Sequence, residues 1–175
     1  MLEKIKNNLS LVACILGVFA SLMIFFPALS YDLEYFELEK MIGGDIEGMM
    51  FGITGWGVCF GMDIAGERLF DFSLKCLGAY CLPVMGVICL VSAENKRDKG
   101  ARQSAFLCFL VGAIFLFVIP FLVEGMALTT DEGLEDMWDL GIGALSGAIA
   151  CALSAVCLWF ELQISYKNSK VFPET

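Results

Sequence analysis

The sequence contains no histidine, and this absence removes several classes of chemistry. Without an imidazole there is no Ser-His or Cys-His activation of a nucleophile, no HExxH zinc site and no haem ligation by histidine. No phosphate-binding loop and no dinucleotide-binding glycine fingerprint is present either. We therefore expect a protein that is not an enzyme and carries no cofactor.

Charge is also scarce: Asp, Glu, Lys and Arg make up 18% of the chain, and they are almost absent from four long apolar runs. A helix needs about 20 apolar residues to cross a bilayer core of about 30 Å. The chain is 58% hydrophobic with a mean hydropathy of +0.77. These features predict an all-α membrane protein, a four-helix transmembrane bundle forming a single domain over residues 1–175. The predicted spans are Leu9–Leu29, Leu74–Val91, Ala105–Val123 and Leu140–Leu162.

The first apolar run also resembles a secretory signal, because Lys4 and Lys6 precede it and Ala28-Leu29-Ser30 end it. It is longer than the usual signal core of about 7–15 residues. We therefore expect it to be retained as the first transmembrane helix.

Basic residues indicate the orientation of the chain, since cytoplasmic segments carry an excess of Lys and Arg. Eight of the eleven flank one side of the predicted spans, and three lie on the other. We expect the cell membrane as the location, with both termini and Ser92–Ser104 cytoplasmic. The eight are Lys4, Lys6, Lys96, Arg97, Lys99, Arg102, Lys167 and Lys170; the three are Lys40, Arg68 and Lys75.

The outer loops are acidic: fifteen of the twenty Asp and Glu residues fall in them. Phosphate binding needs clustered Lys or Arg, so we expect no nucleic acid as an outer partner. Five acids of the second loop lie close together in the sequence and are expected to form a solvated acidic face, with a Ca²⁺ site as the alternative. We expect no metal there. These acids are Asp131, Glu132, Glu135, Asp136 and Asp139, of which the first four are candidate outer-loop interaction residues.

The long outer loop, residues 30–73, has strand-like patterning. Tyr31–Glu39 alternates apolar and polar residues with a one-residue slip that a bulge would produce, and Gly43-Gly44 is a natural turn. Met49–Met62 is apolar and rich in glycine, with Thr54, Trp56, Val58 and Phe60 on one predicted strand face. We expect a small β-rich extracellular loop between the first and second helices. A re-entrant membrane segment over Met49–Met62 is the alternative.

Small residues at four-residue spacing predict close helix packing in two spans. Small side chains allow backbones to approach each other in lipid, where packing drives helix association. The contact is either within the bundle or between two copies of the chain. The residues are Ala13, Gly17 and Ser21 in the first span, and Gly143, Ala144, Gly147 and Ala148 in the fourth.

Six of the eight cysteines lie inside the apolar runs, where cysteine packs as a small hydrophobe. The other two are Cys59 in the outer loop and Cys76 at the entry to the second span. A disulfide between them is one option and two free thiols the other. Together with Trp56 and the acids of the second loop, Cys59 is a candidate outer-loop interaction residue.

Trp56-Gly57-Val58-Cys59 matches the Trp-x-x-Cys part of the claudin first-loop signature. With its four spans and long first outer loop, the chain resembles the claudin and peripheral-myelin-protein type of tetraspan. Thr54-Gly55 replaces the Gly-Leu of that signature, and the nearest following cysteine is Cys76. The chain is also similar to small four-span proteins of Gram-positive bacteria, on the pattern Phe25-Phe26-Pro27 at the end of the first span. The resemblance implies an architecture and no activity.

The functional hypothesis is a non-enzymatic multi-pass membrane protein, an accessory or interaction subunit. Its partners would be the lipid bilayer and either another membrane protein or a second copy of itself. The alternative is a small oligomeric channel or transporter. Ion-coupled carriers place ionisable residues near the middle of the membrane, whereas Glu124, Asp139 and Glu161 lie at predicted helix ends.

Overall fold

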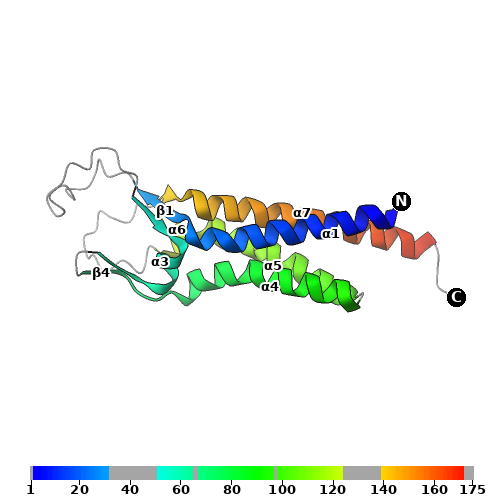
Figure 1. The fold of residues 1–175 in the computed structure, drawn as a ribbon, viewed down its shortest axis with the longest axis horizontal. Coiled ribbons are helices and arrows are strands. Elements are labelled where there is room, and N and C mark those ends of the chain that lie inside the picture. The colour runs from blue at the N-terminus through cyan, green and yellow to red at the C-terminus, as the bar shows by residue number, and fades with distance from the viewer. Residues whose placement is uncertain (1, 32–50, 65–66, 97, 124–138, 172–175) are drawn as a thin grey trace.

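A computed structural model describes residues 2–31, 51–64, 67–96, 98–123 and 139–171. Four long helices run side by side as an elongated bundle, with short strands gathered at one end (Figure 1). We call this end the sheet end. The opposite end, where α1 begins and α7 finishes, is the termini end.

The four predicted spans are confirmed as helices that are long and apolar enough to cross a membrane. Their apolar stretches are Asn7–Phe25, Leu74–Glu94, Gly100–Phe117 and Ile142–Ile164. The helices that carry them are α1 (Leu2–Leu22), α4 (Leu74–Lys96), α5 (Lys99–Phe117) and α7 (Ile142–Val171).

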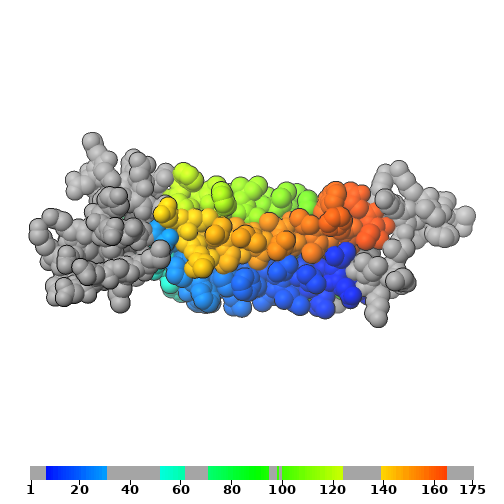
Figure 2. Space-filling view, turned by 90° about the horizontal axis from the view of Figure 1, so that it is seen from above, coloured from blue at the N-terminus to red at the C-terminus, as the bar shows by residue number. Residues whose placement is uncertain are grey.

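The helices form a closed ring in which α1 packs on α4 and α7, and α5 packs on α4 and α7. Along one side of the molecule α7 lies between α1 and α5 (Figure 2). The fourth span is accordingly the most buried of the four. Its Ala144, Cys151 and Leu158 are buried and follow one another at seven-residue spacing, which is two turns of a helix.

Two predicted helix ends are wrong at the sheet end. The first helix gives way to a 3-10 turn, η1 (Met23–Phe25), and then Pro27–Tyr31 form strand β1. Leu140, predicted to begin the fourth helix, lies in strand β5 (Asp139–Leu140). Hydropathy does not distinguish a membrane helix from a strand that continues its apolar run, as β1 and Leu140 of β5 do here.

The third apolar run is divided. Helix α5 ends at Phe117, Val118 leaves the helical conformation, and a short helix α6 (Ile119–Val123) follows. Pro120 has no amide hydrogen with which to bond the carbonyl of Leu116 four residues earlier, so the backbone ladder breaks here.

A three-stranded antiparallel sheet covers the sheet end, with strand order β2-β1-β5 and β2 at Phe51–Thr54. Leu29 of β1 stands opposite Ile53 on one side and Leu140 on the other, and Leu29 and Ile53 are fully buried. A separate hairpin pairs β3 (Met62–Ile64) with β4 (Glu67–Phe70). A small sheet is therefore present, but β5 comes from outside the predicted β-rich loop. The predicted alternation of Tyr31–Glu39 and the Gly43-Gly44 turn fall almost wholly outside the described residues.

The predicted strand face of Thr54, Trp56, Val58 and Phe60 is wrong, although Phe51–Thr54 of the same segment is a strand. The centre of the segment is a short helix, α3 (Gly55–Phe60), between β2 and β3. Thr54 caps this helix: its hydroxyl accepts a hydrogen bond from the Gly57 amide at 3.2 Å. Glycine lowers helix propensity, but a capping threonine and tertiary contacts outweigh that cost over six residues.

Candidate functional site

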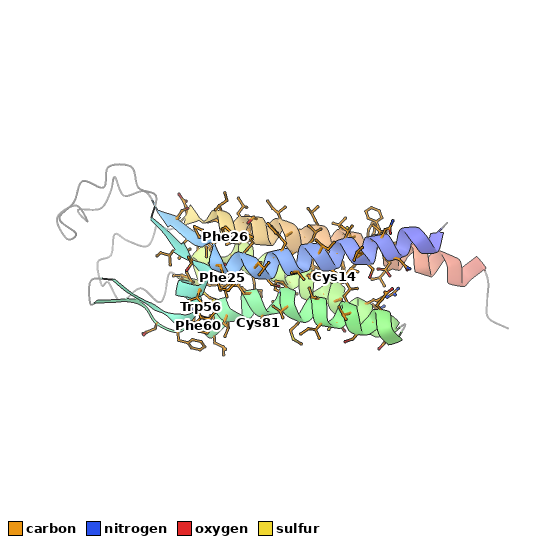
Figure 3. All side chains as sticks on the ribbon, in the orientation of Figure 1. Cys14, Phe25, Phe26, Trp56, Phe60 and Cys81 are labelled. Atoms are coloured by element: carbon orange, nitrogen blue, oxygen red, sulfur yellow. The ribbon has the colours of Figure 1, made fainter. Side chains whose placement is uncertain are left out.

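Four exposed aromatic side chains lie together at the sheet end, and we call them the aromatic ledge. Their neighbouring ring centroids are 6.1 Å apart for Phe25 and Trp56, 4.2 Å for Trp56 and Phe60, and 6.2 Å for Phe60 and Phe72. Each side chain is between 40% and 61% exposed. Phe25, Trp56 and Phe60 follow one another from the end of α1 toward α4 (Figure 3). The ledge thus joins three chain segments into one apolar surface.

Helix α3 is fixed against the bundle by backbone hydrogen bonds at both ends. At its start the Gly55 amide donates to the Phe26 carbonyl at 3.1 Å, and at its end the Ser73 amide donates to the Cys59 carbonyl at 2.9 Å. Gly61 then adopts a φ of 92°, a conformation that favours glycine, and the chain turns into β3. Because Trp56 and Phe60 are four residues apart on this fixed helix, both project from the same face.

The opposite face of α3 is buried against α4. Val58 and Cys59 are fully buried, and the ring and hydroxyl of Tyr80 pack directly on Gly55, where a Cβ would come within 2.5 Å of the hydroxyl oxygen. No hydrogen-bond partner for that hydroxyl lies among the described residues. Only a glycine leaves room for this contact.

Of the two candidate residues predicted on this segment, the structure exposes Trp56 and buries Cys59. Burial raises the pKa of the Cys59 thiol to about 12, so the thiol is neutral at physiological pH. A thiolate is the nucleophilic and metal-binding form of cysteine. Cys59 and Cys76 are both free thiols, and Cys76 is positioned by the hydrogen bond from its amide to the Ser73 hydroxyl. Cys59 therefore contributes packing to this site, and Trp56 contributes surface.

Gly17 of α1 packs against an aromatic ring in the interior of the bundle. Phe109 of α5 is fully buried, and a Cβ at Gly17 of α1 would lie 2.6 Å from its ring. A Cβ at Gly86 of α4 would lie 2.9 Å from the same ring. Phe109 thus reaches across the bundle between two other helices, and both glycines make the space that it fills.

The small residues of α7 face α1 and the sheet within the same chain. A Cβ at Gly143 would meet Phe26 and the Pro27 carbonyl oxygen at 2.8 Å. A Cβ at Gly147 would meet Leu116 at 3.3 Å and Met23 at 3.4 Å. Of the remaining predicted packing residues, Ala13, Ala144 and Ala148 are buried, and the Ala13 carbonyl accepts a hydrogen bond from the Ser154 hydroxyl of α7 at 3.1 Å. Ser21 donates within α1 to the Gly17 carbonyl at 2.9 Å.

At the termini end, a charged side chain is buried where the sequence indicated only a helix end. Glu161 of α7 is 1% exposed and accepts a hydrogen bond from the Arg102 guanidinium of α5 at 2.5 Å. The same guanidinium donates to Glu94 of α4 at 3.0 Å, and Glu94 is half exposed. One arginine therefore links three helices. Asp98 caps the start of α5, the helix that carries Arg102: the Asp98 carboxylate accepts a hydrogen bond from the Gly100 amide at 2.8 Å.

In the sequence analysis Arg102 is one of eight basic residues that indicate the orientation of the chain, and its pairing with Glu161 is not predicted. A usable signal was present: Glu161 lies within an apolar run, and a carboxylate in that setting requires a partner. The acidic set Asp131, Glu132, Glu135 and Asp136 lies outside the described residues. Among the described residues, no three Cys, Asp or Glu side chains are arranged to hold a metal ion.

Comparison of the chain with protein-family models, curated proteins and solved structures found no match.

Proposed function

We propose that this chain is a non-enzymatic accessory or interaction subunit of a membrane assembly, acting through its surface and not through its interior. The observation that carries the proposal is the filled bundle centre at Phe109. A conduit within one chain needs a polar or open path between the helices, and here a fully buried ring occupies the space between α1, α4 and α5.

The two ends of the bundle support the same conclusion. At the termini end, the Arg102–Glu161 pair ties α5 to α7, with Glu94 extending the link to α4. At the sheet end, β1 is the central strand and pairs with β2 on one side and β5 on the other. The sheet therefore joins the end of the first span to the segments that lead into α3 and α7. Helices joined at both ends are suited to presenting a fixed outer surface to a partner.

The proposed location is the cell membrane, with the termini end in the cytoplasm and the sheet end outside. The excess of basic residues near the termini end supports this orientation. In this arrangement the acidic loops of the sheet end face outward, and a soluble or membrane-bound partner on that side would carry complementary basic groups.

Two measurements on the full-length protein test the proposal. Native mass spectrometry after mild detergent extraction from the source cells should show a complex with a second protein in fixed stoichiometry. Ion flux from liposomes containing the purified protein should equal the flux from protein-free liposomes.

The variant Phe109→Ala sharpens the second measurement, because it removes the ring that fills the bundle centre. Under the proposal it loosens the fold and leaves the flux at background. Flux that rises with the amount of reconstituted protein would replace the accessory function with the channel or transporter alternative. A further rise in Phe109→Ala would place the path within one bundle, and an unchanged flux in that variant would place it between copies.

A further inference from the structure

The aromatic ledge lies at the level where the spans end. The first apolar span ends at Phe25, a ledge residue, and the second begins at Leu74, two residues after the ledge residue Phe72. The first span has 19 residues and, at 1.5 Å per residue, rises about 28 Å, close to the thickness of a bilayer core. The ledge is therefore placed at the boundary between the acyl chains and the headgroups.

The surface next to the ledge is apolar and exposed. Leu22, Phe26 and Leu74 are each more than half exposed, and each lies within three residues of a ledge residue along the chain. The exposed Asp71 lies just before Phe72, outside the second span, and the exposed Lys75 is the second residue of that span. Aromatic rings and charged residues at the end of an apolar span are the pattern of side chains at a membrane interface.

The size of the ledge favours lipid over a protein partner. Four aromatic side chains of roughly 200 Å² each, about half exposed, offer about 400 Å². A specific protein interface needs about 800 Å² from each partner. Lipid has no such requirement, because the ledge continues the apolar surface that the helices already present to the acyl chains.

We propose that the aromatic ledge is a membrane-docking surface that inserts into the headgroup–acyl boundary of the leaflet at the sheet end, with Trp56 at its centre. Helix α3 then lies in the interface with one face on α4 and the other on lipid. Because the two ends of α3 are hydrogen-bonded to Phe26, just before β1, and to Ser73, just before α4, this insertion sets the depth of the whole sheet end. The inference depends on membrane embedding and is independent of the accessory function.

The test measures where Trp56 lies, using its fluorescence in the full chain. The variant Trp138→Phe/Trp159→Phe leaves Trp56 as the only tryptophan, and it is reconstituted into phosphatidylcholine vesicles. Some vesicles carry bromine high on the acyl chain and others carry it near the chain end. A side chain docked about 5–10 Å into the interface should lose about half its emission to the high bromines and clearly less to the low ones. Iodide in the water should quench it weakly.

A pair of variants tests whether the neighbouring rings of the ledge help to hold Trp56 in the interface. Phe60→Ser removes the ring nearest to Trp56 and should shift its emission toward the red and weaken the bromolipid quenching. Phe121→Ser changes an exposed aromatic residue of α6 outside the ledge and should leave both unchanged.

Two results would overturn the proposal. Strong quenching by iodide with little by bromolipids would place the ledge in water. Weak quenching by both would mean that protein covers the ledge, whether another segment of this chain, a second copy or a partner. If both quenchers are weak, the protein is also solubilised in brominated detergent. Loss of Trp56 emission there would show that the tryptophan can be quenched by bromine once the membrane is removed.

Discussion

Arg102 and Glu161 form an ion pair between α5 and α7 at 2.5 Å, although 59 positions separate them in the chain. Both side chains are largely withdrawn from solvent, at 11% and 1% exposure. Removing one partner of a buried pair leaves an uncompensated charge, whereas replacing both by apolar groups is often close to neutral. In a double-mutant cycle, a single replacement in this pair should therefore destabilise the fold more than the replacement of both residues.

We expect Arg102→Met to lower the free energy of unfolding by about 3–5 kcal/mol, because it leaves Glu161 charged and buried. Arg102→Met/Glu161→Met should recover most of that loss. The measurement is the loss of helical circular dichroism in a titration of sodium dodecyl sulfate against a mild detergent.

The matched control for this cycle is Glu94, the half-exposed partner of the same arginine. Glu94→Gln should cost less than about 1 kcal/mol, since a pair open to solvent contributes little. If Arg102→Met proves no more costly than Glu94→Gln, the ion pair does not stabilise the fold.

Sequence reasoning identified the parts of this fold that depend on continuous stretches of the chain. A span of 18 or more apolar residues is a linear property, so all four spans were predicted. The Arg102–Glu161 pair depends on how α5 and α7 are rotated against each other, and no linear pattern contains that rotation. The same holds for Phe109, whose position between Gly17 and Gly86 requires three helices to be placed.

The error at Gly55–Phe60 has a different physical origin. The alternation of Thr54, Trp56, Val58 and Phe60 fits a strand, and glycine lowers helix propensity. The i, i+4 spacing of Trp56 and Phe60 fits a helix equally well, and Thr54 three residues before Gly57 is a cap that the sequence displays. A short apolar segment can fit the two-residue period of a strand and the 3.6-residue period of a helix equally well. Here the segment is a helix that packs on α4.

Two glycines in helices should respond to alanine in opposite directions. At Gly143 a Cβ would lie 2.8 Å from both Phe26 and the Pro27 carbonyl, so Gly143→Ala should lower stability by about 1–3 kcal/mol through overpacking. At Gly78 of α4 nothing lies within 4 Å of the Cβ position, so Gly78→Ala should raise stability by about 0.5–1 kcal/mol.

The same detergent titration compares the two variants, and oligomeric state is measured alongside by light scattering. Unchanged stability with loss of an oligomer in Gly143→Ala would mean that this face joins two copies of the chain instead of packing within one.

Phe109→Ala should be among the most damaging single substitutions, costing about 3–5 kcal/mol, because the ring is buried against Gly17 and Gly86, which have no side chains with which to close the cavity. Phe115→Ala on the same helix provides the comparison, since that side chain is exposed. Thermal unfolding in nanodiscs measures both. Similar losses for the two variants would show that the centre collapses around the missing ring.

Thiol labelling in intact cells tests the orientation. A cysteine at Gly100, near the termini end, should be shielded from a membrane-impermeant maleimide, and one at Thr130 should label. Native Cys59 should not contribute in the folded protein, because burial raises its pKa to about 12 and leaves it as a neutral, inaccessible thiol at the labelling pH. Permeabilised cells supply the positive control for Gly100→Cys. Labelling of Gly100→Cys but not Thr130→Cys in intact cells would reverse the proposed orientation, while labelling of both would contradict the four-span topology.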